Sequence, residues 1–241
     1  MKLSILSSAL TVLALTGSAH ASSFPRVDAD IKIYDDEVAA MRAKFHQTPA
    51  APTHLGWVQS KLQHLVDVDQ VMRHYTDTPF AHQYSAAEKQ EFWKQFMTRF
   101  SELDHEDTAE LKALLKLYPW FTVSRFGAQA DRNAWLLVQH ADQDPVFQQT
   151  VLAILTELWP KGETSPSNYA YLFDRVANSP NFPSQRKPQR YGTQGHCIGP
   201  GKWEPWPIED PAYLDERRAS VGLGTEADYI LVFRDICHVA G

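Results

Sequence analysis

The chain has 241 residues, of which 44% are hydrophobic and 22% charged, a composition typical of a globular protein. It excludes a wholly disordered chain, a collagen, a disulfide-dense miniprotein and a membrane channel. The formal net charge of −6 does not favour nucleic acid or an anionic membrane as a partner, because both need a net basic face.

The N-terminus has the pattern of an export signal. Met1-Lys2 supplies a short positive start, Leu3–Thr16 is an apolar run, and Ala19-His20-Ala21 places small residues where a signal peptidase cleaves. We therefore expect residues 1–21 to be a signal peptide and the mature protein to be soluble, either periplasmic or secreted. The alternative is an uncleaved anchor, but the run is shorter than the roughly 20 residues of a membrane helix. No later stretch predicts an integral membrane segment.

The chain contains two cysteines, Cys197 and Cys237. An oxidising compartment and an even count favour a disulfide between them. The alternative is two unpaired thiols. No second feature marks either one as a catalytic cysteine.

Residues 22–128 are expected to form an N-terminal helical region, because apolar residues recur at three- and four-residue intervals. Phe92, Phe96 and Phe100 follow one another once per turn and are expected in the core. The predicted helices are Asp30–His46, Leu55–Tyr75, one that begins at the capping box Ser85-Ala86-Ala87-Glu88, and Thr108–Leu117.

Residues 129–241 are expected to form a separate C-terminal domain. Asp144-Pro145, Ser165-Pro166 and Asp210-Pro211 each place a capping side chain before a proline suited to the first helical position. The helices that they start are expected to end near Leu158, Asn178 and Val221, with Gly222 as the C-terminal cap of the last and a further helix from Thr225 to Ile236.

The segment between these helices is rich in Pro, Gly and Trp and has no helical period. Gln189–Gln194 and Lys202–Trp206 are short enough to be the two strands of a hairpin. The predicted fold class is therefore mainly α, a helical domain with a small irregular β-hairpin insert in the C-terminal half.

Five blocks of the C-terminal half resemble a bacterial family known only as a domain of unknown function. The resemblance covers roughly Asn133 to Tyr229 and leaves residues 22 to about 128 outside it. It implies common ancestry and brings no activity with it. The blocks are Trp135–Asp142, Tyr171–Val176, Gln189–Gln194, Pro207–Asp210 and Leu214–Leu223.

His140 is the first candidate for chemistry, because a histidine oriented by a carboxylate can act as a general base. Asp142 lies nearly opposite on a helix and cannot pair with it unless the helix has ended. Asp174 is the other candidate partner or acid. The alternative for His140 is a core histidine bonded to a backbone carbonyl, and the alternative for Asp174 and Arg175 is a structural ion pair with Arg190, Asp215 or Arg218.

A metal or cofactor is not expected. Asp144 is already explained as a helix cap, and no His or Cys spacing supports a metal site. The sequence also lacks a nucleophile elbow, a phosphate-binding loop and a dinucleotide fingerprint.

The block Gln189–Gln194 suggests a binding site for a small polar ligand. Arg190 suits an anionic group, amide side chains give directional hydrogen bonds, and aromatic rings provide a flat wall. The alternative is a loop pinned by its own polar side chains. The predicted ligand-binding residues are Gln139, Asp142, Arg175, Gln189, Tyr191, Gln194 and Trp203.

Three functions remain open from the sequence. The first is an exported soluble protein that binds a small polar or anionic ligand or a cell-envelope component. The second is a cofactor-independent hydrolase or lyase of the envelope, with His140 as base, Asp174 or Asp142 as its partner or the acid, and Arg190 stabilising developing negative charge. The third is a protein–protein adaptor that acts through the N-terminal helices. The sequence does not indicate an oligomeric state.

Overall fold

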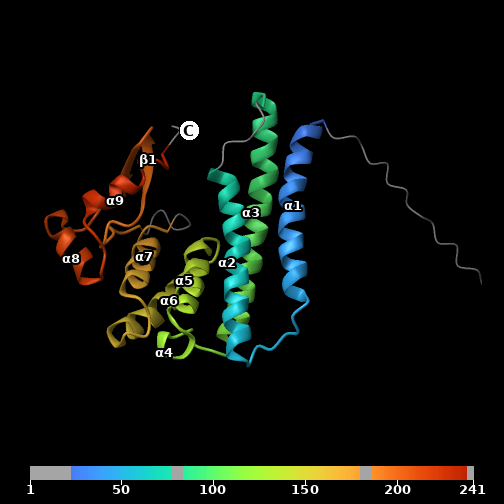
Figure 1. Cartoon of the computed structure of the whole chain (residues 1–241). Coiled ribbons are helices and arrows are strands. Elements are labelled where there is room, and N and C mark those ends of the chain that lie inside the picture. The colour runs from blue at the N-terminus through green and yellow to red at the C-terminus, as the bar shows by residue number, and fades with distance from the viewer. Residues whose placement is uncertain (1–22, 78–83, 180–185, 238–241) are drawn as a thin grey trace, which may run out of the picture.

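The computed structural model describes residues 23–77, 84–179 and 186–237. Within these ranges the fold is mainly α, as predicted. Three long helices lie side by side and alternate in direction: α1 (Pro25–His46), α2 (Leu55–Asp77) and α3 (Ala86–Leu115) (Figure 1). Residues 1–21, for which we predicted a signal peptide, lie outside the described ranges.

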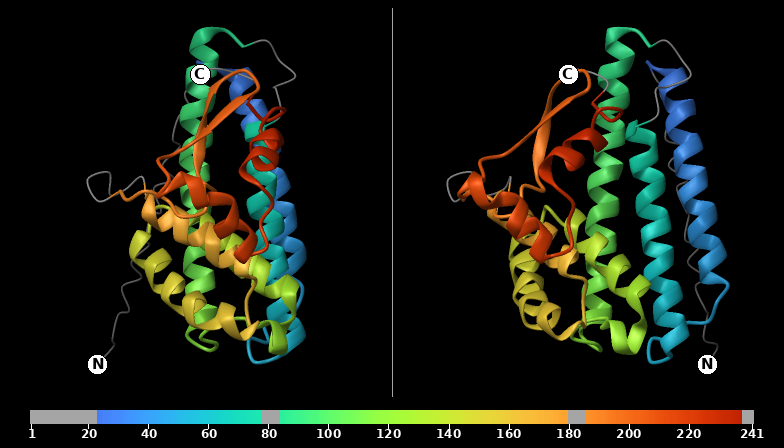
Figure 2. Two further views of the ribbon diagram at one scale, coloured as in Figure 1. Left: turned by 90° about the vertical axis from the view of Figure 1, so that its left-hand side faces the viewer. Right: turned by 60° about the vertical axis from the view of Figure 1, so that its left-hand side comes forward.

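Four shorter helices cover one side of this three-helix bundle. They are α4 (Val123–Phe126), α5 (Ala128–His140), α6 (Pro145–Leu158) and α7 (Pro166–Ala177). Among them α5 packs directly against both α2 and α3. The strands β1 (Gly195–Gly199) and β2 (Lys202–Pro205) and the helices α8 (Leu214–Ser220) and α9 (Glu226–Val232) lie beyond α7 on the same side of the bundle (Figure 2).

Two features of the long helices correct the sequence prediction. The first helix begins at Pro25, before the expected Asp30, because proline suits the first helical position and Val27 already continues the buried stripe. The expected separate helix Thr108–Leu117 is wrong, since Thr108–Leu115 is the end of α3 and Lys116 is its C-terminal cap. No proline or glycine interrupts the chain between Ala86 and Leu115, so nothing ends the helix there.

Local capping was predicted correctly at three positions. Ser85 and Glu88 form the reciprocal capping box of α3, Asp144 accepts the Phe147 N–H at 3.0 Å, and Thr225 accepts the Asp228 N–H at 3.2 Å. Gly222, at φ 73°, ends the helix before it as expected. Two expected caps are absent in the described structure: Ser165 and Asp210 make no capping hydrogen bond.

Several predicted ends also shift. The Asp210-Pro211 pair begins a short 3₁₀ turn that leads into α8, and α9 ends at Val232 and not at Ile236.

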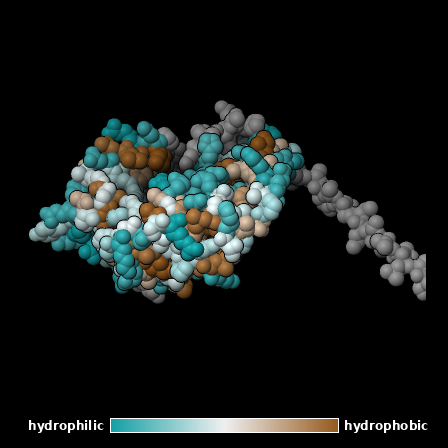
Figure 3. Space-filling model, turned by 60° about the horizontal axis from the view of Figure 1, so that its bottom comes forward, coloured by the Kyte–Doolittle hydropathy of each residue, from teal (hydrophilic) through white to brown (hydrophobic). Residues whose placement is uncertain are grey.

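The buried apolar residues form two clusters. One lies toward the start of α1 and contains Ile31, Met72 and Phe96. The larger one joins α2 and α3 to α5, α6 and α7, through residues such as Leu62, Leu111, Val138, Leu155 and Leu172. The predicted domain boundary at 128/129 falls within α5, just after its first residue, and α5 shares this second cluster with α2 and α3. Where described residues cover the face in Figure 3, apolar patches are broken up by polar side chains.

The β-hairpin is present, but its first strand is not where we predicted it. The strands β1 and β2 are antiparallel, with Cys197 opposite Trp203, whereas Gln189–Gln194 folds as an irregular loop that turns at Gly192 (φ 63°). The predicted disulfide is confirmed: Cys197 is bonded to Cys237 and ties the hairpin to the segment after α9. Within the described ranges, no helix combines the length and apolar character needed to cross a membrane.

Candidate functional site

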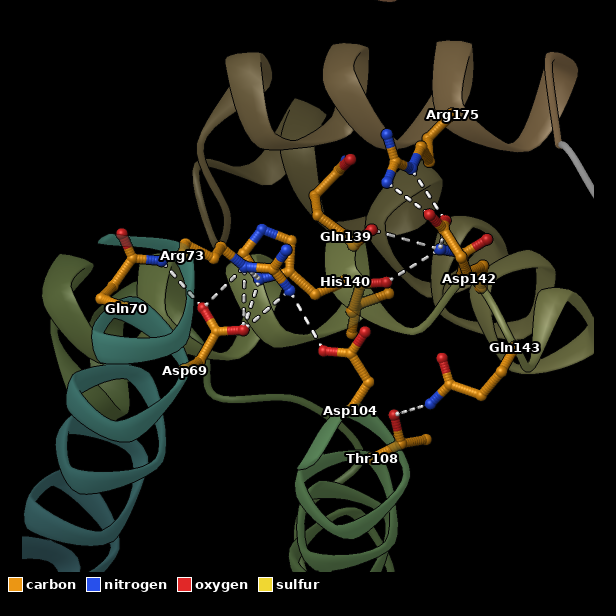
Figure 4. Close-up of polar contacts among 12 residues, drawn as sticks. Asp69, Gln70, Arg73, Asp104, Thr108, Gln139, His140, Asp142, Gln143 and Arg175 are labelled. Atoms are coloured by element: carbon orange, nitrogen blue, oxygen red, sulfur yellow. Dashed lines mark hydrogen bonds and ion pairs between the residues drawn. The ribbon is translucent and has the colours of Figure 1, made fainter. Parts of the chain in front are cut away.

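Six charged or titratable side chains meet where α2, α3, α7 and the end of α5 come together (Figure 4). We call this set the polar cluster. Its members come from both halves of the chain, and solvent reaches several of them: the exposed fraction is 25% for the Arg73 side chain, 17% for His140 and 32% for Arg175. The members are Asp69, Arg73, Asp104, His140, Asp142 and Arg175.

His140 is the last residue of α5, and two side chains of α2 hold its ring in place. Its Nδ1 atom lies 2.9 Å from Oδ1 of Asp69 and 2.9 Å from Nε of Arg73. The Arg73 Nε–H is also directed at both oxygens of Asp69, at 3.1 and 3.3 Å. A proton on Nδ1 would therefore be donated to Asp69, and Nε2 would then present a lone pair. Burial lowers the pKa of His140 despite the opposing effect of Asp69, so the ring is neutral at neutral pH.

Asp69 is the ionised anchor of the polar cluster. It is 1% exposed and accepts hydrogen bonds from Arg73 Nη2 at 2.9 Å and Gln70 Nε2 at 2.8 Å. Burial alone would raise its pKa, but the hydrogen bonds with His140 and Arg73 and the positive charge of Arg73 lower it to about 2. A permanent carboxylate at this position fixes the orientation of the imidazole.

Asp104 differs from Asp69 in that its pKa is raised and not lowered. Its Oδ1 atom lies 3.1 Å from Nη2 of Arg73. Burial raises its pKa to about 7, with further increases from the charges of Asp69 and Asp142 that Arg73 only partly offsets. Near neutral pH this carboxyl can therefore donate or accept a proton. The polar cluster thus contains a neutral imidazole and a titrating acid, linked through the guanidinium of Arg73.

The second pair in the polar cluster is Asp142 with Arg175. The guanidinium meets the carboxylate in two contacts, Nε to Oδ1 at 2.9 Å and Nη2 to Oδ2 at 2.6 Å, and Nη1 donates to Oε1 of Gln194 at 2.9 Å. Gln139 lies beside them (Figure 4). It is 6% exposed, and its Nε2 atom has no hydrogen-bond partner in the described structure. The structure therefore brings Gln139, Asp142, Arg175 and Gln194 together.

Asp174 holds the loop Gln189–Gln194. Its side chain is fully buried and accepts the backbone N–H groups of Arg190 at 2.7 Å and Thr193 at 2.9 Å. It also accepts the N–H of Tyr191 at 3.1 Å and the Thr193 hydroxyl at 2.9 Å. Burial raises the pKa of Asp174, and these hydrogen bonds oppose that effect.

Gln189, a residue of the same loop, stabilises it through side-chain hydrogen bonds to backbone carbonyls. It is fully buried and donates to the carbonyls of Gln194 at 2.8 Å and Trp206 at 2.7 Å. The alternative of a loop pinned by its own polar side chains therefore describes Gln189, while Asp174 of α7 is an additional anchor from outside the loop. A catalytic role for Asp174 stays a prediction that nothing in the fold tests.

The other predicted site residues lie apart from His140. The Arg190 side chain is 48% exposed, with Nε 3.7 Å from Glu209. Tyr191 is buried, and Trp203 is buried in a stack on Phe233, with ring centroids 4.5 Å apart. Among the described residues, no hydrogen bond, ion pair or ring contact joins these three to His140 or Asp104.

The ion pairs considered for Asp174 and Arg175, with Arg190, Asp215 or Arg218, do not form among the described residues. Arg175 pairs with Asp142, and Arg190 lies near Glu209. Arg218 is buried and donates to the carbonyls of Tyr191 at 2.7 Å and Gly224 at 2.6 Å. Asp215 accepts the backbone N–H of Glu226 at 2.8 Å.

The sequence analysis missed Asp69, Arg73 and Asp104. A signal for Asp69 is present: it occupies a position where the apolar stripe Leu62, Leu65, Val66 of α2 calls for another apolar residue. A charged residue on a buried stripe, with an arginine one turn later, indicates a partner on another element.

Within the described ranges, no group of three or more His, Cys, Asp or Glu side chains is arranged to hold a metal ion. The fold and the polar cluster define a mainly helical protein in which a partly exposed histidine pairs with a buried aspartate, between a three-helix bundle and a C-terminal half.

A model of the family of unknown function DUF6624 matches residues 58–240, and the chain belongs to this family. The match begins well before Asn133, so the expectation that it leaves out everything to about residue 128 is wrong. Most of α2 and all of α3 lie in the same matched region as His140. No curated protein and no solved structure matches the chain.

Proposed function

We propose that this protein binds a small polar substrate at the polar cluster and acts on it as a cofactor-independent hydrolase or lyase. One observation carries the proposal: the Nδ1 atom of His140 is held 2.9 Å from the Asp69 carboxylate, and no described residue hydrogen-bonds to Nε2. An imidazole fixed in this way is prepared to act as a general base.

Three members of the polar cluster have roles in the proton transfers of such a reaction. Nε2 of His140 would take a proton from water or from the substrate, and ionised Asp69 would stabilise the imidazolium that forms. Asp104, whose pKa is raised by burial to about 7, would return a proton to the leaving group. General acid–base catalysis by positioned groups contributes about 10²–10⁴ in rate.

Gln139 and its neighbours support the binding step. The unpartnered Nε2 of Gln139 is a buried donor, and a buried donor without an acceptor is costly unless something occupies it. It lies beside the Arg175 guanidinium, which Asp142 and Gln194 hold in one orientation. A carbonyl, carboxylate or hydroxyl oxygen of the substrate would supply the missing acceptor. Arg190 has no part in this proposal, because it lies on the exposed side of the loop.

The catalytic test compares wild type with His140→Asn, using the purified mature protein. The probes are a peptidoglycan digest and p-nitrophenyl esters, with products followed by liquid chromatography and mass spectrometry. We expect turnover that falls about 10²–10⁴-fold in the variant. His105→Asn, an exposed histidine on α3, is the matched control and should keep wild-type turnover.

Two results would count against parts of the proposal. An NMR titration that places the His140 pKa above neutrality would remove the base, because the ring would already be protonated. Saturable binding of a probe without turnover, lost in Gln139→Leu, would leave a binding protein and not an enzyme. No contact in the described structure favours the adaptor function.

We also propose export, with cleavage after Ala21 and a periplasmic or secreted mature protein. The Cys197–Cys237 disulfide supports it, because structural disulfides persist in oxidising compartments. Mass spectrometry of the N-terminal peptide, recovered from the periplasmic fraction or the medium, should give Ser22 as the first residue. Recovery of the protein only from the cytosol, beginning at Met1, would contradict this.

A further inference from the structure

A cavity lies between α1, α2 and α3 and shares no residue with the polar cluster. Its volume of about 350 Å³ is in the range of small-molecule pockets. Four of the side chains that line it carry or can carry positive charge: Arg42 and His46 from α1, and Lys61 and His64 from α2. Facing them are Glu106, Asp107 and Glu110 from α3. We call this cavity the α1–α3 pocket.

Asp107 is a buried carboxyl in the lining of this pocket. Its residue is 6% exposed, and its Oδ2 atom has no hydrogen-bond partner in the described structure. Burial raises its pKa to about 8, with smaller increases from the charges of Asp69 and Asp104 that Arg42 and Lys61 oppose. At neutral pH it is therefore mostly a neutral hydroxyl donor, and it does not repel an anion.

Lys61 is the buried cation of the α1–α3 pocket. It is 7% exposed, and Nζ lies 3.1 Å from Glu110, whose side chain is 50% exposed. Arg42 pairs in the same way with Glu106, whose side chain is 57% exposed. Pairs with such exposed carboxylates are weak in water, so both glutamates can be displaced by a better-placed anion.

His64 is the pocket histidine whose pKa the neighbouring positive charges lower. Burial first, and then the charge of Lys61, lower the pKa of His64, and the charges of His46 and Arg42 add to this effect. Asp67 opposes it. The ring stacks on Phe45 with centroids 4.4 Å apart, which holds it at the edge of the pocket. A bound anion would relieve the repulsion among these groups.

We propose that the α1–α3 pocket binds a small molecule through an oxyanion group, a carboxylate or a phosphate. The oxyanion would form an ion pair with Lys61 and accept a hydrogen bond from the Asp107 carboxyl, beside His64 and Arg42. A cationic ligand fits less well, because Arg42 and Lys61 would repel it and already pair with Glu106 and Glu110.

The test is calorimetric titration of the full mature protein with inorganic phosphate and, separately, with succinate. We expect saturable binding of one or both, and the stronger of the two identifies the oxyanion class. Lys61→Met should weaken binding at least about tenfold. Asp107→Asn keeps a neutral donor and should stay within about threefold of wild type, whereas Asp107→Leu should lose binding. Lys89→Met, an exposed lysine on α3, is the control and should bind as wild type.

NMR of the histidine side chains gives an independent readout that does not depend on folding of a variant. The signals of His64, assigned by comparison with His64→Gln, should show a higher pKa in the presence of the bound probe. The proposal is wrong if neither probe binds and the His64 pKa stays unchanged. It is also wrong if Lys61→Met, folded as judged by circular dichroism, binds as tightly as wild type.

Discussion

The Nδ1 atom of His140 lies 2.9 Å from Oδ1 of Asp69, although the two residues are 71 positions apart in the chain. The contact joins the end of α5 to the middle of α2 and so links the C-terminal half to the three-helix bundle. Arg73 closes the arrangement by donating to Asp69 and Asp104, and its Nε atom lies 2.9 Å from Nδ1 of His140. A single carboxylate therefore orients the candidate base and anchors the candidate acid through one guanidinium.

Asp69→Asn should destabilise the protein by about 3 kcal/mol, because removing one member of a buried charge pair leaves the other without compensation. Urea unfolding followed by circular dichroism would measure the change. The pKa of His140 should also fall further, since Asp69 is the group that raises it. Asp67→Asn is the matched control: Asp67 is exposed on the same helix, and its loss should cost no more than about 0.5 kcal/mol. Equal stabilities for the two variants would contradict the role given to Asp69.

The sequence predicted what is encoded locally. The caps at Ser85, Asp144 and Thr225 were found because each involves residues only three positions apart. The position of the hairpin was missed because Gln189–Gln194 is not organised by its own strand propensity. Asp174, 16 to 19 residues earlier, takes up the N–H groups of this loop that a strand would offer to a neighbour.

Only part of the candidate site could be predicted from the sequence. His140, Gln139, Asp142, Arg175 and Gln194 were predicted as site residues, and the structure brings them to one place. The partner of His140 was not found, because pairing between residues on α2 and α5 depends on how two helices pack, and helical periodicity does not report that. The same reason explains why Asp104 was missed: its role depends on its closeness to Arg73, 31 residues away.

Asp174→Ala should destabilise the protein by about 3–5 kcal/mol, because three backbone N–H groups and one hydroxyl would lose a charged acceptor in a buried place. Thermal and urea unfolding would show the loss. Arg190→Ala, at an exposed side chain of the same loop, should change stability by no more than about 0.5 kcal/mol. If Asp174→Asn instead abolished turnover at wild-type stability, Asp174 would be a catalytic residue and not an anchor of the loop.

Asp107 should make the protein less stable as pH rises. Its pKa is 3.8 in an unfolded chain and about 8 in the fold, so between these values the folded state binds more protons than the unfolded state. Stability contributed by the protonated carboxyl is complete below pH 3.8 and is lost progressively up to about pH 8. The stability of Asp107→Asn relative to wild type should therefore increase across this window, by up to about 6 kcal/mol at about 1.4 kcal/mol per pH unit.

Urea unfolding of wild type and Asp107→Asn at several pH values would measure this difference. His140 and Asp69 have lowered pKa values and act in the opposite direction, but they are common to both proteins and cancel in the comparison. If the difference in unfolding free energy between Asp107→Asn and wild type stayed constant from acid to pH 8, the carboxyl would be ionised in the fold. That result would contradict the proposal for the α1–α3 pocket.

Reduction of the disulfide should destabilise the C-terminal half. The bond between Cys197 and Cys237 closes a stretch of 40 residues, and opening a loop of that length costs about 4 kcal/mol in the chain-entropy model. Within the loop, Trp203 packs on Phe233 and Tyr229, so we expect tryptophan fluorescence to report the loss along with the lower unfolding midpoint. The comparison is wild type with and without a reductant, and Cys197→Ala/Cys237→Ala should match the reduced protein in both conditions. If the reductant left the midpoint of wild type unchanged, the fold around the hairpin would be held by its packing alone, and the disulfide would no longer support export to an oxidising compartment.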